Sequence, residues 1–114
     1  MPMMRVCLEP TDSDYDAEWN ITLDLTVSDE GQPSPRMTSF GVRGGLASTS
    51  SSIEPFLLFG DGTIDFGTGW EDDERELRTN LFGGTAIRVG EYFTIGDGEE
   101  AVTYRVTRIL DRAQ

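Results

Sequence analysis

The sequence contains no histidine and no lysine, and all nine of its basic residues are arginines. Without histidine the chain cannot build a Ser-His or Cys-His nucleophile pair, an imidazole metal ligand or an imidazole proton shuttle. Without lysine it cannot form a Schiff base or supply the lysine of a phosphate-binding P-loop. Many common routes to catalysis are therefore closed, and we predict that the protein is not an enzyme and uses no cofactor.

Cysteine and long apolar runs are also scarce. Cys7 is the one cysteine of the chain, so no disulfide can form within it. No apolar run has the length that a transmembrane helix needs, and residues 1–9 do not have the pattern of a signal peptide. We therefore expect a cytoplasmic protein with no membrane partner.

Negative charge dominates the composition, because 21 acidic residues stand against nine arginines and give a net charge of −12. A field of this sign repels the phosphates of nucleic acids and anionic membrane surfaces, and it steers the chain toward basic partners. Acidity also confers solubility without any partner. The composition thus predicts no nucleic-acid partner and favours a basic protein surface, and solubility alone is the alternative explanation.

The length of 114 residues suits one domain, and neither an internal repeat nor a break in composition divides the chain. The 13 glycines exceed average usage and fit a fold with many turns. We predict a single all-β domain over residues 1–114, a small barrel or sandwich of about six to eight mostly antiparallel strands.

Alternation of apolar and polar residues predicts where several of these strands lie. The longest alternating segment covers residues 19–28, and another covers residues 3–9 and ends at Pro10, which lacks a donor for the ladder. A further strand is expected over residues 36–43. Its inward face is predicted to consist of Thr38, Phe40 and Val42.

Residues 85–110 have the pattern of a β-hairpin, with a polar, glycine-rich turn at residues 96–100. The two apolar sets that flank this turn are Ile87, Val89, Phe93 and Ile95, then Val102, Tyr104 and Val106. Glu91 shares the parity of the first set, where burial would make it a candidate catalytic acid. A bend at Gly90 that directs Glu91 outward is the interpretation that we favour.

Two segments have patterns that allow more than one structure. Residues 56–59 are continuously apolar, which fits either one turn of helix or a buried strand. One short helix is expected near residues 71–79, because two glutamates there each precede an arginine by four residues, the favourable order for helical ion pairs. A strand over residues 77–82 is the alternative.

Three acidic clusters supply the candidate partner-binding residues. They are Asp12, Asp14, Asp16 and Glu18; Glu71, Asp72, Asp73 and Glu74; and Asp97, Glu99 and Glu100. The first cluster places oxygens at every second residue, as calcium-binding loops do, but it lacks the glycine and the closing glutamate of such a loop. We therefore predict no metal site, and we expect that clusters sharing one side would form a surface for a basic partner.

These features together predict a non-enzymatic, acidic protein-binding module, of the kind found in inhibitors, immunity proteins and adaptors, that docks on a basic protein surface. The alternative is a structural subunit of a phage or secretion-type assembly, in which strand edges would also allow a homo-oligomer. A hydrolase that uses carboxylates alone is a third candidate, and it would need two acids placed across a cleft.

Overall fold

The computed structural model describes residues 3–12, 19–44, 54–67, 76–96, 98 and 101–111. These residues contain eight strands and no α-helix. The strands are β1 (Met3–Pro10), β2 (Ile21–Thr26), β3 (Ser39–Arg43), β4 (Glu54–Leu58), β5 (Thr63–Asp65), β6 (Glu76–Arg78), β7 (Tyr92–Ile95) and β8 (Val102–Asp111). The predicted all-β, single-domain fold is confirmed.

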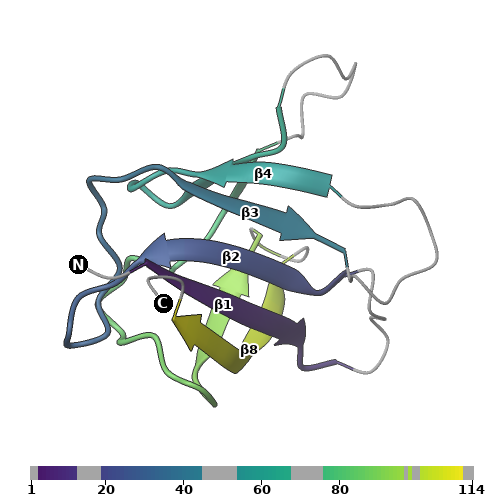
Figure 1. The fold of residues 1–114 in the computed structure, drawn as a ribbon. Helices are drawn as coiled ribbons and strands as arrows, with labels where there is room; N and C mark the ends of the chain where they lie inside the picture. The colour runs from purple at the N-terminus through teal and green to yellow at the C-terminus, as the bar shows by residue number, and fades with distance from the viewer. Residues whose placement is uncertain are drawn as a thin grey trace.

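The strands follow one another around a nearly closed barrel in the order β6-β5-β4-β3-β2-β1-β8-β7 (Figure 1), and all of the pairs are antiparallel. Between the two outermost strands, an isolated bridge joins Thr79 to Ile95, and the Gly96 amide donates to the Arg78 carbonyl at 2.7 Å. This arrangement is an up-and-down barrel, which leaves few strand edges open.

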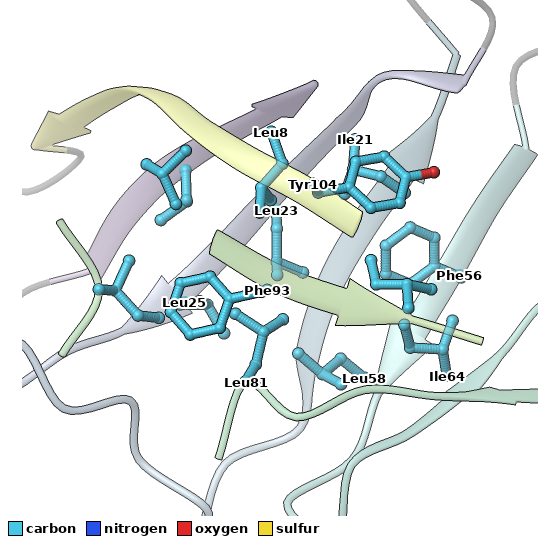
Figure 2. Packing of buried hydrophobic residues seen from close by; sticks show 14 of the residues in the cluster. Leu8, Ile21, Leu23, Leu25, Phe56, Leu58, Ile64, Leu81, Phe93 and Tyr104 are labelled. Carbon is cyan, nitrogen blue, oxygen red and sulfur yellow. The ribbon is translucent and has the colours of Figure 1, made fainter. Parts of the chain in front are cut away.

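Side chains from alternate strand positions fill the barrel, as the period of two in a β-strand requires. Figure 2 shows two of the bulkiest, Tyr104 from β8 and Phe93 from β7, within the same cluster of apolar residues. The buried core consists of Val6, Leu8, Ile21, Leu23, Leu25, Val27, Phe56, Leu58, Ile64, Leu81, Ile87, Phe93, Ile95, Val102, Tyr104 and Val106. The alternation in residues 3–9 and 19–28 is confirmed by burial of the apolar side chains at positions 6, 8, 21, 23, 25 and 27, whereas Trp19, which shares the parity of the second set, is 38% exposed.

The ambiguous run at residues 56–59 forms a strand over most of its length. Phe56 and Leu58 of β4 are buried while Leu57 between them is exposed, which is the alternation of a half-buried strand. β4 pairs with β3 along its whole length, and Leu57 and Leu58 also pair with β5 on the other side. Of the two structures that the sequence allowed, the strand is therefore correct and the helical turn is not.

The predicted inward face of β3 is wrong. Phe40 is 51% exposed, whereas Ser39 and Gly41 are buried. The reason lies in the neighbouring strand, because the ring of Phe56 occupies the space where a side chain at position 41 would stand. Position 41 therefore faces the core although glycine has no side chain. Because alternate residues of a strand face the same side, Arg43 at the end of β3 also faces the interior of the barrel.

The helix expected near residues 71–79 is not present in the part of this segment that the structure describes. Residues 76–78 form β6, where Leu77 pairs with Ile64 of β5 and packs against the core. Surface ion pairs in a helix are worth about 0.2–0.5 kcal/mol each, which is less than burial of a leucine contributes. The strand alternative is correct for residues 77 and 78, and residues 71–75 lie outside the described residues.

Gly90 directs Glu91 away from the core, as we favoured. The Glu91 amide donates to the Arg88 carbonyl at 3.0 Å, and Gly90 has φ of +94°, so residues 88–91 make a tight turn that requires glycine at its third position. Val89 is 60% exposed at this turn, and its predicted place in the core is wrong. The expected hairpin itself is confirmed as β7 and β8.

Two loops close the end of the barrel at which β1 begins and β8 ends (Figure 1). The Ile87 amide donates to the Gly31 carbonyl at 2.8 Å, and the Gln32 side chain donates to the Gly84 carbonyl at 3.0 Å. Leu81 and Ile87 are buried beneath these contacts. The opposite end of the barrel holds the cavity described next.

Candidate functional site

A cavity of about 380 Å³ lies at the end of the barrel where β2 begins and β3 ends. Its least exposed lining residues, each at most 2% exposed, are Ile21, Ile64 and Tyr104. Leu77, Ile95 and Val102 line its walls, and Trp19, Arg43, Phe66 and Gly96 complete the lining. A volume of this size is within the range of small-molecule sites, which often lie in the mouths of β-barrels.

The pairing of β2 with β3 places the polar part of the cavity. Ile21, the first residue of β2, pairs with Arg43, the last residue of β3. The Gly44 amide donates to the Asn20 carbonyl at 2.8 Å and extends this pairing by one step. Trp19 immediately precedes Asn20, so this pairing places the indole next to the side chain of Arg43.

Arg43 is held by two aromatic rings and one carboxylate. Its guanidinium carbon lies 5.3 Å from the ring centroid of Trp19 and 4.5 Å from that of Phe66, which are cation–π distances. Its Nη2 donates to Glu54 Oε1 at 2.9 Å, and its Nε donates to the same oxygen at 3.3 Å. The positive charge of Arg43 is therefore balanced by an adjacent negative charge.

Phe66 is in turn fixed by the core. Its ring centroid lies 5.4 Å from that of Phe56 at an interplanar angle of 58°, a tilted arrangement that aromatic pairs favour. The contact links the cation–π partner of Arg43 to the ring that fills the space above Gly41. Arg43 is consequently positioned by side chains that belong to the packed interior.

The cavity is apolar in character. Of the described residues that line it, Arg43 is the one charged side chain, and none is a carboxylate. The other side chains are aromatic or branched aliphatic. Such a lining can hold an apolar body and exclude water, whereas glycosidase-type hydrolysis requires two opposed carboxylates.

Asp12 is the one predicted site residue that lies within the described part of the chain. It is exposed and follows the end of β1, where the Thr11 amide and hydroxyl both donate to the Thr103 carbonyl of the strand next to it. The remaining predicted site residues lie outside the described residues. They are Asp14, Asp16, Glu18, Glu71, Asp72, Asp73, Glu74, Asp97, Glu99 and Glu100.

The strands that flank the three acidic clusters end at the same end of the barrel. The clusters lie in the connections from β1 to β2, from β5 to β6 and from β7 to β8. In an up-and-down barrel these alternate connections all start and finish at one end. Residues from the flanking strand ends, among them Ile21, Leu77 and Val102, line the cavity. The attachment points of the acidic segments therefore surround its opening.

The net charge of the protein resides almost entirely in these connections. Residues 12–18, 71–75 and 97–100 carry charges of −4, −3 and −3, which leaves −2 of the total of −12 for the rest of the chain. The described barrel is thus nearly neutral apart from these segments.

Sequence reasoning did not find the residues around the cavity. Trp19, Arg43 and Phe66 come from three separate strand ends, and each reads locally as an ordinary surface or strand residue. Gly41 was the available signal, because a glycine within a strand often marks the close approach of another group. An inward Gly41 would have predicted an inward Arg43.

Comparisons with protein-family models, with curated proteins and with solved structures find no match to this chain. Function is therefore inferred from the residues of the chain itself. Over the ranges that the structure describes, no helix has both the length and the apolar character needed to cross a membrane.

Proposed function

We propose that the protein is a non-enzymatic, acidic binding module that docks on a basic surface of a partner protein through the end of the barrel that holds the cavity. The observation that carries this proposal is the charge distribution, because three segments with −10 of the net −12 are attached to strand ends at that end. We propose a cytoplasmic location and no cofactor, membrane or nucleic-acid partner for this module.

Concentration of charge at one end has a specific physical advantage over an even distribution. Electrostatic fields around proteins are screened over about 8 Å at physiological ionic strength, so only nearby charges act together on an approaching surface. Clustered charges accelerate association and orient the encounter, and they disfavour partners of the same sign. The nearly closed barrel provides a rigid support for the three segments.

Capture of partners at different salt concentrations tests this proposal. Tagged protein is used to retain proteins from the cells in which the chain is native, at low and at high sodium chloride. We expect a basic partner whose retention falls at least about fivefold between about 0.1 M and 0.5 M salt, because screening weakens charge-steered association. Partners that are retained equally at both concentrations would contradict the proposal.

A structural subunit of an assembly is the second candidate, favoured by an apolar patch on the outer face of β3 and β4. The exposed Phe40 lies opposite the exposed Leu57, and Val42 lies opposite Pro55. Adjacent apolar side chains on an outer surface often mark an interaction site. Sedimentation that shows a monomer at every concentration would argue against self-assembly through this patch.

A further inference from the structure

The cavity at the barrel end has a lining that selects among small ligands by polarity and charge, a property that docking on a partner protein does not require. The least exposed of its lining residues are Ile21, Ile64 and Tyr104, which are at most 2% exposed and provide apolar contact area. An apolar lining of this kind favours ligands with aromatic or branched aliphatic bodies.

The environment of Arg43 disfavours charged ligands of both signs. An anion would have to compete with Glu54, whose carboxylate already accepts from Arg43 at 2.9 Å, and it would meet the net charge of −12. A cation would meet the guanidinium, and the nearby rings of Trp19 and Phe66 already take part in cation–π contacts with Arg43. A neutral ligand avoids both penalties.

The volume sets the size of such a ligand. An apolar cavity of about 150 Å³ is enough to bind benzene. The cavity measures about 380 Å³ and therefore accommodates a molecule with two fused rings. We propose that it binds an uncharged, mainly apolar molecule of this size. This inference goes beyond partner docking and does not depend on it.

The test uses two probes of the same shape and different charge, 2-naphthamide and 2-naphthoate, with the full-length protein. Binding is measured by isothermal titration calorimetry and by changes in the amide NMR spectrum. We expect 2-naphthamide to bind at least about tenfold more tightly than 2-naphthoate, because the carboxylate would have to be desolvated beside Glu54. Tighter binding of 2-naphthoate, or no binding of either probe, would overturn the proposal.

A matched pair of variants locates the site. Val102 lines the cavity and is 8% exposed, whereas Val89 is 60% exposed at a turn outside it. Val102→Phe fills part of the volume and should weaken 2-naphthamide binding at least about tenfold, while Val89→Phe should leave it unchanged. Equal affinities in the two variants would show that the probe binds elsewhere and would refute the proposal.

Glu54→Gln supplies a second variant that does not change the packing volume, in case Val102→Phe does not fold. It removes the negative charge that balances Arg43 and keeps a side chain of similar shape. The affinity for 2-naphthoate should rise at least about threefold, and that for 2-naphthamide should change little. An unchanged ratio of the two affinities would contradict the role assigned to the Arg43–Glu54 pair.

Discussion

Gly60→Ala is expected to destabilise the fold by about 3 kcal/mol or more, one of the two largest effects that we predict for a single substitution. Gly60 lies in the turn between β4 and β5, which is closed by hydrogen bonds between Phe59 and Thr63 and between Gly62 and Phe59, each 2.9 Å long. A Cβ at position 60 would overlap the carbonyl oxygen of Pro35 and would lie 2.6 Å from its carbonyl carbon. Because both groups belong to backbone, the loop before β3 would have to move.

Chemical and thermal denaturation measure this effect, and a loss of about 3 kcal/mol corresponds to a fall in Tm of roughly 12 °C for a domain of this size. Gly84→Ala is the matched control, since Gly84 has φ of +101° and nothing within 4 Å of the added carbon. The control should cost only about 1 kcal/mol of backbone strain. If Gly60→Ala costs no more than this control, the predicted backbone overlap is absent.

Gly41→Val should cost about 3 kcal/mol, because β3 faces the core at this position. A Cβ there would overlap the ring of Phe56, with Cε1 of that ring at 2.6 Å, and would lie 2.9 Å from Cδ1 of Leu23. These neighbours are side chains within the packed core, so the strain spreads into β2 and β4. Equilibrium unfolding in urea gives the loss of free energy.

A compensating substitution distinguishes this overlap from a loss of glycine flexibility. Phe56→Leu removes the ring and should cost about 1–2 kcal/mol alone through the cavity that it leaves. In the double variant the valine occupies part of that cavity. The double variant should therefore be destabilised by at least about 1 kcal/mol less than the sum of the two single-variant costs. Additive costs would show that Gly41 and Phe56 do not compete for the same space.

Much of the barrel could be predicted from the sequence because half-buried strands impose a period of two. β1, β2 and β8 are long enough for several consecutive matches, and apolar residues of that alternation form much of the core. β3 has five residues and a glycine at its centre, so its pattern wrongly favoured an inward position for Phe40, which is exposed, over one for Gly41. Parity in such a short strand depends on its partner, which local sequence does not reveal.

β6 illustrates a different limit. Of its three residues, Arg78 follows Glu74 by four positions, a spacing that is typical of ion pairs on a helix surface, yet the segment completes the barrel between β5 and β7. Its backbone pairs with Thr63, Ile64 and Asp65, and the burial of Leu77 depends on that pairing. Tertiary contacts of this kind override a local preference worth a few tenths of a kcal/mol.

The candidate site also has a part that the sequence predicts and a part that it does not. The acidic clusters are visible in the sequence as charge, but their attachment to one end follows from the order of the strands. The cavity requires Trp19, Arg43 and Phe66 to meet across three connections, and the pairing of β2, β3, β4 and β5 in one curved sheet brings them together. Local sequence patterns therefore predict the charge of the connections between strands better than they predict which residues line the cavity.

Partner capture with two charge-matched variants tests the docking proposal most directly. One variant neutralises four acids in the acidic connections, Asp14→Asn, Asp16→Asn, Glu99→Gln and Glu100→Gln. The other neutralises four acids placed toward the opposite end, Asp29→Asn, Glu30→Gln, Glu91→Gln and Asp111→Asn. Both variants therefore have the same net charge and the same kinds of substitution.

At about 0.1 M salt, we expect the first variant to retain at least about fivefold less of the basic partner than the second, which should behave like the unsubstituted protein. Equal retention by the two variants would contradict docking through the end of the barrel that carries the acidic connections.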